Sequence, residues 1–266
     1  MPRADRSSRL IRRLREDGRA SVATLARDLG VTPSTIRRDL ARLADDGTLV
    51  RTYGGAALPL PAGAAPSGPA AEAKRAIAVA AAGLVEDGQT IAISSGSTTL
   101  ALARQLVDRR LTVITNALDV ASILLDRDGI ELVVLGGVVR PRMHSMLGHL
   151  AELALRELRA DTLFMGIGAV DPDHGLMNDS IPEILTDRAL RRSARSCVVL
   201  ADASKFSGVS PAFVFGLKEV DLVVTDAGVD PADVVALRAR GVRVIVAPRA
   251  GAFPLSGVPK GAHPNP

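Results

Sequence analysis

The sequence predicts an α/β protein with a small helical N-terminal domain and a larger domain built on a mostly parallel sheet. Two observations support this prediction. Beyond residue 72, apolar runs alternate with stretches of helical spacing, a pattern typical of strands separated by covering helices. Before that point, a stretch rich in proline and glycine at residues 57–71 interrupts the periodicity and predicts a linker. The length of 266 residues suits one large or two modest domains.

The composition is that of an ordinary globular protein, with 47% hydrophobic and 23% charged residues. The uncharged stretch Gly88–Ala103 is too short and too polar to cross a bilayer, and no apolar run follows the charges at the N-terminus. We therefore expect a cytoplasmic protein without a membrane partner. The single cysteine, Cys197, excludes an internal disulfide, and the four histidines show no metal-ligand spacing. We expect neither a metal ion nor another cofactor.

Charge is distributed unequally along the chain. Residues 1–56 contain twelve arginines and seven acidic residues, a net charge of +5, whereas the remainder is nearly neutral. Every basic residue of the first part is arginine, whose forked guanidinium group suits phosphate and guanine. This distribution is typical of a nucleic-acid-binding domain joined to a second domain, although charge alone equally suits a solvated helical face. Only six aromatic residues occur, which argues against base-stacking platforms for single strands or RNA.

Three helices fit the first 46 residues of the chain. The first has an apolar stripe within residues 10–14, and Ser21 is a good N-cap for the second. Gly30 then supplies a turn. After it, Thr32 is placed to cap the third helix and Pro33 to occupy its first position.

The third helix has an inner and an outer face. Ile36, Leu40 and Leu43 follow the i, i+4, i+7 spacing of a buried stripe. On the opposite face and its flank the sequence places hydroxyls and arginines, namely Ser34, Thr35, Arg37, Arg38 and Arg42. A recognition helix needs such groups to reach base edges in a major groove and to bind the adjacent phosphates. In the hairpin predicted over Thr48–Ala56, Arg51 is placed to contact the DNA backbone or a minor groove.

The run LARDLGVTPSTIRRDLARLADDGTLVRTYGGA, at Leu25–Ala56, resembles the N-terminal signature of the DeoR (deoxyribose-repressor) family of bacterial regulators. Its marks are TIRRDL at Thr35–Leu40 and an R-x-[HY]-G-G-A ending at Arg51–Ala56, in which Tyr53 stands where many relatives have histidine. The resemblance implies a winged helix-turn-helix DNA-binding domain over residues 1–56. It also implies double-stranded operator DNA as the partner of the third helix and of the hairpin.

Seven apolar runs with β-branched residues predict strands in the larger domain, which we place at residues 72–247: Thr90–Ile93, Leu111–Ile114, Ile130–Leu135, Thr162–Ile167, Cys197–Leu200, Leu222–Thr225 and Val242–Val246. Between most of them lie stretches of helical spacing: Ala73–Val85, Thr99–Val107, Ala117–Leu125, Leu150–Leu158 and Ile184–Ala194. Strands that are apolar on both faces favour a parallel sheet with helices on both sides. Ligands bind such sheets in the loops beyond the C-terminal ends of the strands. The Pro- and Gly-rich residues 248–266 predict a disordered tail.

The loop Ser94–Thr99 connects a predicted strand to a predicted helix. Its small residues would let backbone N–H groups approach an anion, its hydroxyls would donate further hydrogen bonds, and the helix N-terminus adds positive partial charge. The loop lacks the Gly-Lys-Ser/Thr of a nucleotide P-loop, which argues against ATP hydrolysis. A capped helix start after a tight turn explains the same residues equally well.

Other strand ends have similar small polar groups: Thr115-Asn116, Gly136-Gly137 followed by Arg140, Gly166 and Gly168, and Asp202–Lys205. Several such loops at one edge of a sheet would enclose a small polyhydroxy anion. Thr115 and Asn116 would bind hydroxyls, while Lys205 or Arg140 would supply positive charge. For Lys205, an exposed charge at a strand end is the simpler alternative.

These loops resemble, in the same order along the chain, the effector domain of the DeoR family. The matching segments are Gly96–Thr99, Thr115-Asn116, Gly136-Gly137 and Asp202–Phe206. The resemblance implies a sensor related in fold to ribose-5-phosphate isomerase and the CoA transferases, with a phosphorylated sugar as its effector. The effector-binding residues expected from these loops are Ser95, Gly96, Ser97, Thr98, Thr99, Thr115, Asn116, Gly136, Gly137, Arg140, Asp202 and Lys205. The chain departs from the family after Glu183, because Asp187-Arg188 stands where relatives often have Lys-Arg.

The sequence thus indicates a DNA-binding transcriptional regulator that is not an enzyme, a repressor of carbohydrate-metabolism genes relieved by a phosphorylated sugar or related metabolite. One helix-turn-helix reads only a few base pairs, so we expect a homo-oligomer, either a dimer or a tetramer. Two alternatives remain open from the sequence. Glu183, Asp202 and Lys205 are groups that a sugar-phosphate isomerase-like enzyme fused to a DNA-binding domain would use for proton transfer. In a third interpretation, the domain is an oligomeric scaffold whose loops bind nothing specific.

Overall fold

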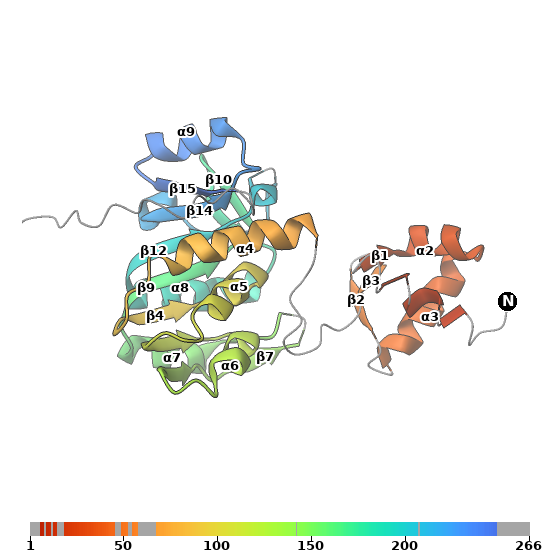
Figure 1. Cartoon of the computed structure of the whole chain (residues 1–266), viewed down its shortest axis with the longest axis horizontal. Helices are drawn as coiled ribbons and strands as arrows, with labels where there is room; N and C mark the ends of the chain where they lie inside the picture. Colours follow the sequence, from red (N-terminus) through yellow and green to blue (C-terminus); the bar gives the residue numbers. More distant parts are fainter. Residues whose placement is uncertain are drawn as a thin grey trace, which may run out of the picture. The chain divides into compact units, whose positions relative to one another are not determined.

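The computed structural model describes residues 6, 7, 9–11, 13, 14, 19–45, 49–52, 55–57, 68–141, 143–206 and 208–248. The chain divides into two compact units, Met1–Ala71 and Glu72–Pro266. Figure 1 shows the elements of each unit, coloured from red at the N-terminus to blue at the C-terminus. Residues 58–67 of the predicted linker and 249–266 of the predicted tail lie outside the described residues.

The N-terminal unit packs helices against a small antiparallel sheet. The described residues between 6 and 14 are helical, and they are followed by β1 (Arg19–Ser21), α2 (Val22–Leu29), α3 (Pro33–Asp45), β2 (Val50–Thr52) and β3 (Gly55–Ala57). The three strands pair in the order β1-β3-β2, so the predicted hairpin gains a third strand that the sequence did not indicate. All three helices contribute to the core of this unit, whose fully buried members include Leu10, Leu14, Leu25, Ile36 and Leu40.

The turn between α2 and α3 follows from its local chemistry, as predicted. Ser21 Oγ accepts a hydrogen bond of 3.0 Å from the N–H of Thr24 at the start of α2. Helix α2 ends at Gly30, whose φ of 63° lies in the left-handed region that glycine adopts at little cost. Thr32 Oγ1 accepts a hydrogen bond of 3.3 Å from the N–H of Thr35 at the start of α3. These caps satisfy backbone groups that a helix terminus leaves unpaired.

A seven-stranded sheet with the order β15-β14-β12-β9-β4-β5-β6 forms the middle of the C-terminal unit, and all its neighbouring strands are parallel. Its strands are β4 (Thr90–Ile93), β5 (Leu111–Thr115), β6 (Ile130–Val134), β9 (Ala160–Gly166), β12 (Ala194–Leu200), β14 (Leu222–Asp226) and β15 (Arg243–Ala247). Each of them corresponds to a predicted strand. Because the strands are parallel, all their C-terminal ends lie along one edge of the sheet.

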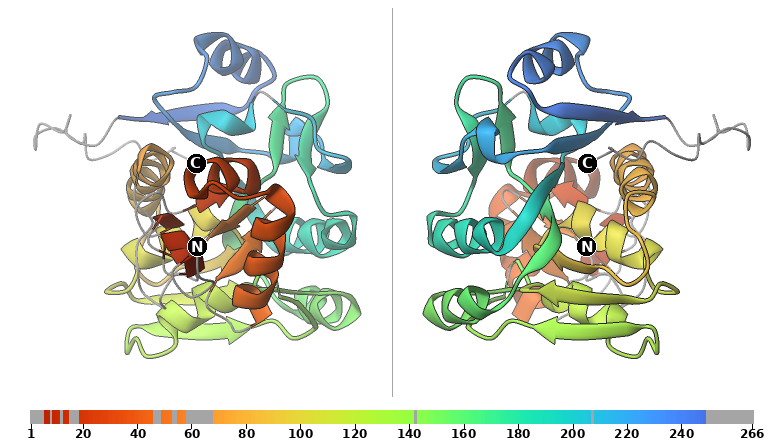
Figure 2. Two further views of the ribbon diagram at one scale, coloured as in Figure 1. Left: turned by 90° about the vertical axis from the view of Figure 1, so that its right-hand side faces the viewer. Right: turned by 90° about the vertical axis from the view of Figure 1, so that its left-hand side faces the viewer.

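Helices cover both faces of this sheet, as predicted. They are α4 (Pro69–Ala82), α5 (Ser97–Gln105), α6 (Leu118–Leu124), α7 (His149–Glu157), α8 (Ile184–Ser193) and α9 (Pro231–Ala239). Helices α4, α5 and α6 share one hydrophobic core with the sheet, and α7, α8 and α9 share the other. Figure 2 shows α4 and α5 on the side of the sheet opposite α7 and α8. None of the described helices is long and apolar enough to cross a membrane.

The structure differs from the sequence prediction in its short elements and in one boundary. Helix α4 begins at Pro69, within the stretch predicted as a linker, because proline suits the first turn of a helix and the following alanines favour helix. Two small antiparallel sheets contain β7 (Val138–Arg140), β8 (Ser145–Leu147), β10 (Ala169–Asp171), β11 (Gly175–Asn178) and β13 (Ala212–Phe215). Three short 3₁₀-helices also occur, η1 (Ile181–Glu183), η2 (Ala203–Lys205) and η3 (Leu217–Glu219). Such segments are too short to show a clear hydrophobic period.

The two glycines between β6 and β7 should tolerate substitution very differently. Gly137 has a φ of 146°, and a methyl group there would lie 2.5 Å from the carbonyl oxygen of Leu147. A methyl group at Gly136 would meet nothing within 4 Å. We expect Gly137→Ala to lower the free energy of unfolding by about 1–3 kcal/mol, and Gly136→Ala to change it by less than about 0.5 kcal/mol. Urea unfolding of the two variants checks this, and equal effects would contradict it.

Candidate functional sites

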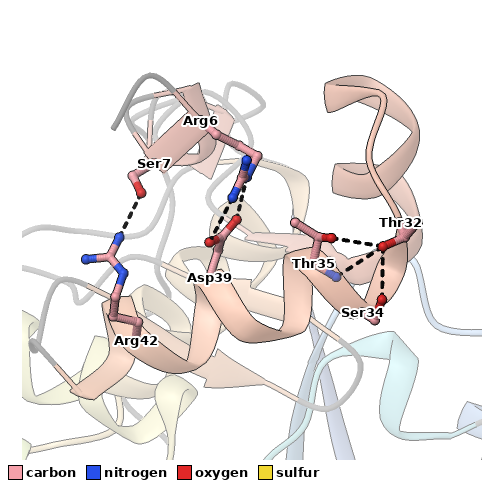
Figure 3. A network of polar contacts seen from close by, with 7 residues as sticks. All are labelled: Arg6, Ser7, Thr32, Ser34, Thr35, Asp39 and Arg42. Carbon is pink, nitrogen blue, oxygen red and sulfur yellow. Dashed lines mark hydrogen bonds and ion pairs between the residues drawn. The ribbon is translucent and has the colours of Figure 1, made fainter. Parts of the chain in front are cut away.

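The outer face of α3 presents the side chains expected of a recognition helix. Ser34, Arg37 and Arg38 are exposed, and Thr35 is half-buried. At the start of the helix, the hydroxyl oxygen of Thr32 lies 2.9 Å from the hydroxyl oxygens of both Ser34 and Thr35 (Figure 3). The first two turns of α3 therefore offer hydroxyls and two guanidinium groups to solvent.

Arg42 is less exposed than Arg37 and Arg38, because it contacts the first helix, and its contact with DNA stays a prediction. Its side chain is half-buried, and its Nη2 donates a hydrogen bond of 2.9 Å to Oγ of Ser7 in the first helix (Figure 3). A long arginine side chain can bury its stem along a neighbouring helix while its head finds an acceptor, which helical spacing alone does not reveal. Arg51 lies in β2, but its side chain is outside the described residues, so its contact with DNA stays a prediction.

A buried carboxylate of α3, which the sequence analysis missed, fixes the first helix to the recognition helix. Asp39 is 2% exposed and accepts hydrogen bonds from Arg6, at 2.5 Å from Nε and 3.2 Å from Nη2. Hydrogen bonding to Asp39 raises the pKa of the Arg6 guanidinium above its usual value. A signal was available in the sequence, because Asp39 follows the buried Ile36 by three residues and so lies beside the inner face. There, a carboxylate requires a cation.

The loop after β4 is packed tightly against the end of β9. Ser94 Oγ accepts a hydrogen bond of 3.1 Å from the N–H of Gly166, and Thr99 Oγ1 donates one of 2.9 Å to the carbonyl of Gly96. Gly96 has a φ of 147°, and a methyl group there would lie 3.8 Å from Cα of Gly166. No side chain caps α5, so the N–H groups of its first turn suit an anion. The remaining loop side chains differ in exposure: Ser95 is half-buried, Ser97 exposed and Thr98 buried.

Two consecutive residues after β5 have different roles. Thr115 is fully buried, and its Oγ1 donates 2.7 Å to the carbonyl of Ile93 and accepts 3.0 Å from the N–H of Ala117. The structure thus uses Thr115 to join two strands, whereas we expected it to bind a ligand hydroxyl. Asn116 is 2% exposed, and its Nδ2 donates 3.1 Å to the carbonyl of Met146. Its Oδ1 has no hydrogen-bond partner among the residues that the structure describes.

We expected Arg140 to supply positive charge to a ligand, but its guanidinium group is already paired with a carboxylate of the protein. Its Nη1 lies 3.0 Å from Oε1 of Glu183 and donates a hydrogen bond to Oγ of Ser180. Glu183 is 7% exposed and also accepts a hydrogen bond of 3.2 Å from Oγ of Ser145. A buried carboxylate costs several kcal/mol unless a cation balances it. Arg140 is therefore the counterion of Glu183, a pairing across 43 sequence positions that no local pattern shows.

The loop after β12 contributes a capping acid and a lysine. Asp202 is 8% exposed, and its Oδ1 accepts hydrogen bonds from the N–H of Ser204, at 3.1 Å, and from its hydroxyl. The same carboxylate caps η2, which ends at Lys205. Lys205 is half-buried and has no ion-pair partner within the part of the chain that the structure describes. It is the available cation among the candidate effector-binding residues.

The buried carboxyl group of Asp187 supports the loop after β9. Asn178 Nδ2 donates a hydrogen bond of 2.6 Å to Asp187 Oδ2, and Asn178 Oδ1 accepts one of 2.9 Å from the N–H of Gly168. Burial raises the pKa of Asp187 to about 7, and the negative charge of Glu183, one turn earlier, acts in the same direction. Asp187 thus holds the loop at Gly168 through one amide side chain. The sequence marked this position as unusual without showing its partner.

The sheet topology brings these loops to one edge. Strands β12, β9, β4 and β5 are successive neighbours, so the loops that contain Asp202, Gly166, Gly96 and Asn116 follow one another along that edge. The Gly136-Gly137 loop comes next, after β6. Within the described part of the chain, no group of three or more His, Cys, Asp or Glu residues is placed to hold a metal ion. The loops at this edge contribute small residues, hydroxyls, the amide of Asn116, the carboxylate of Asp202 and the lysine Lys205.

Comparison with known proteins decides the family. Residues 6–61 match the DeoR-like helix-turn-helix domain, and residues 70–227 match the DeoR C-terminal sensor domain. The chain belongs to the DeoR family. The transcriptional repressor AccR of Agrobacterium fabrum is 33% identical to this DeoR-family regulator over 232 residues, which cover 84% of this chain and 90% of that protein. The glycerol-3-phosphate regulon repressor of Escherichia coli is 31% identical over 232 residues, covering 85% of this chain and 92% of its own.

The predicted family and the predicted α/β class with an N-terminal helix-turn-helix domain are thus confirmed for this DeoR-family regulator. Among solved structures, ribose 5-phosphate isomerase A of Methanocaldococcus jannaschii is similar over 50% of this chain and 53% of its own, with 22% sequence identity and a TM-score of 0.38. The two repressors align with 84% and 85% of this chain, which is more than either domain alone.

The titration of Asp187 should make the stability of the regulator fall as the pH rises. An unfolded aspartate has a pKa of ~3.9, so between about pH 4 and 7 the folded chain holds a proton that the unfolded chain releases. This contribution is complete at low pH and lost as the pH rises through 7. We compare the free energy of unfolding of Asp187→Asn with that of the parent protein at each pH. This difference should be more favourable to the variant at pH 8 than at pH 5, by on the order of 2 kcal/mol. Thermal unfolding at both pH values checks this, and a difference independent of pH would refute it.

Proposed function

We propose that this DeoR-family regulator is a repressor that binds operator DNA through α3 and releases it when a phosphorylated sugar binds at the C-terminal edge of its seven-stranded sheet. The observation that supports the ligand most directly is Asn116, whose buried Oδ1 lacks a donor. A buried acceptor in this state costs about 1–3 kcal/mol, which a ligand hydroxyl would remove. Strand β4, the neighbour of β5 in the sheet, leads into helix α5. No side chain caps the N-terminus of α5, so a phosphate there would accept hydrogen bonds from backbone N–H groups.

The DNA-binding half of the proposal rests on α3. Arg37 and Arg38 point to solvent in the first two turns after the hydroxyls of Thr32 and Ser34, which is where recognition helices contact base edges. One such helix reads only a few base pairs. We therefore propose that the protein acts in the cytoplasm as a homo-oligomer, a dimer or a tetramer, on an operator with repeated half-sites.

Ligand binding must act through a difference between states. A ligand shifts an equilibrium only by its differential affinity for the two states. The effector must therefore bind one arrangement of the subunits more tightly than the DNA-binding arrangement. By linkage, operator DNA must then weaken effector binding by the same factor, typically about five- to 150-fold. We propose release because both curated relatives are named as repressors.

The arginines of α3 provide the test of the DNA-binding half. We expect Arg37→Ala or Arg38→Ala to weaken operator binding by about 1–3 kcal/mol, because a base contact or a charged phosphate contact is lost. A base contact relaxes specificity at one position, whereas a phosphate contact weakens all sequences alike and lowers the salt dependence. Arg243→Ala is the matched control, since Arg243 is an exposed arginine of β15 in the C-terminal unit. Operator affinities at physiological salt that match the parent for both Arg37 and Arg38 variants would contradict the assignment of α3.

The effector half is tested by titrating phosphorylated sugars while operator binding is followed. Lys205→Ala should weaken the response at least about tenfold, because a phosphate loses its cation, while operator binding without ligand stays unchanged. Thr98→Val tests the buried hydroxyl in the first turn of α5. Lys218→Ala is the matched control, because η3 lies before β14 and thus at the opposite edge of the sheet. If the Lys205 and Thr98 variants respond to the same sugar at the same concentration as the parent, the site lies elsewhere.

A further inference from the structure

One wall of the proposed effector site is unusually rich in acceptors and poor in donors. Glu183 and Asp187, each 7% exposed, lie one turn apart where η1 continues into α8. Ser145 joins this wall to the β5 loop, because its hydroxyl donates to Glu183 and its backbone pairs with Ala117, the residue after Asn116. These contacts place the amide oxygen of Asn116, which lacks a donor, near Glu183, and Asp187 follows Glu183 one turn later on α8.

The cations of this wall are already used. The Arg140 guanidinium lies 3.0 Å from Glu183, and a ligand that drew it away would leave Glu183 buried and unbalanced. Asp187 receives a hydrogen bond from the neutral amide of Asn178, and no ion pair of the described residues includes it. Positive charge comes from the N-terminus of α5 and from Lys205, whose loop also contains the capping carboxylate of Asp202.

We propose that this wall restricts the effector to phosphorylated sugars whose carbon skeleton is neutral or carries an amine, and rejects those that carry a carboxylate. The inference rests on the proposed function and deepens it. A ligand hydroxyl or ammonium group donates to the Asn116 oxygen, whereas a carboxylate has no proton to donate and faces Glu183 and Asp187. Rejection of a competitor through like charge and unpaired acceptors is a common source of specificity. Asp187 is thereby a specificity-determining residue.

The experiment uses the full-length protein and three pairs of ligands. The two members of a pair have the same number of carbon atoms and the same phosphate position, but one member has a carboxylate where the other has an aldehyde. The pairs are glyceraldehyde 3-phosphate with 3-phosphoglycerate, ribose 5-phosphate with 5-phosphoribonate, and glucose 6-phosphate with 6-phosphogluconate. Glucosamine 6-phosphate adds the amine. Dissociation constants are measured by calorimetry at pH 8. In every pair that binds, the neutral member should bind about tenfold or more tightly than the acid, and equal or tighter binding of the acid overturns the inference.

Asp187→Asn separates the role of charge from that of shape. The variant keeps the size of the side chain and removes its charge. The ratio of the dissociation constants of the acid and the neutral member should therefore shrink towards one. Asp128→Asn, an exposed carboxylate that precedes β6 at the opposite sheet edge, should leave the preference unchanged. A preference that survives intact in Asp187→Asn overturns the assignment to this residue.

The pH dependence gives a second readout that needs no variant to fold. Asp187 has a pKa of about 7, raised by burial and by Glu183, and its other neighbours in the wall are the neutral Asn178 and the Arg140–Glu183 pair. Both members of a ligand pair share the ionisation of the phosphate, so their affinity ratio reports on the protein. The ratio should shrink from pH 8 to pH 6, and a constant ratio overturns the inference. If no pair binds at either pH, the proposed function itself fails.

Discussion

The parallel direction of all seven strands is the constraint on which the larger unit depends. It requires a crossover between successive strands, and those crossovers provide the helices that bury both faces of the sheet. It also places the C-terminal end of every strand at one edge, where backbone groups are no longer paired within the sheet. Backbone conformation accounts for one of the small residues there, because Gly96 has a φ of 147° and a methyl group on it would lie 3.3 Å from Oγ1 of Thr99. The candidate site is a consequence of this geometry.

The sequence predicted the central strands because they are buried on both faces. Ile91 and Ile93 in β4, like Val223 and Val224 in β14, are fully buried, and continuous apolar runs of this kind mark strands of a covered parallel sheet. The sequence also predicted the caps of α2 and α3, since Ser21 and Thr32 each accept a hydrogen bond from a backbone N–H only three positions away. Local chemistry sufficed wherever the partners were local.

Partners far apart in sequence could not be predicted in this way. Residue type identified Arg42 and Arg140 as cations, but their acceptors are Ser7 and Glu183, 35 and 43 positions away. Thr115 was identified as a hydroxyl near the candidate site, yet both of its hydrogen bonds serve the backbone. In each case the choice between ligand and protein is decided by which backbone or acid the tertiary fold brings within reach, and a single sequence does not contain that distance.

Helix α8 and the 3₁₀-turn before it connect the loop after β9 with the loop after β5. Through Asp187 and Asn178 they hold the Gly168 loop, and through Glu183 and Ser145 they hold β8, which in turn binds Asn116. A ligand that binds at the β5 loop, as proposed, would therefore act on contacts that converge on one helix. Packed elements of this kind shift between discrete arrangements more readily than they deform. The contacts of α8 with the Gly168 loop and with β8 have one preferred arrangement without ligand. If they prefer another arrangement with ligand, the free-energy difference between the two arrangements is the source of any coupling to the DNA-binding unit.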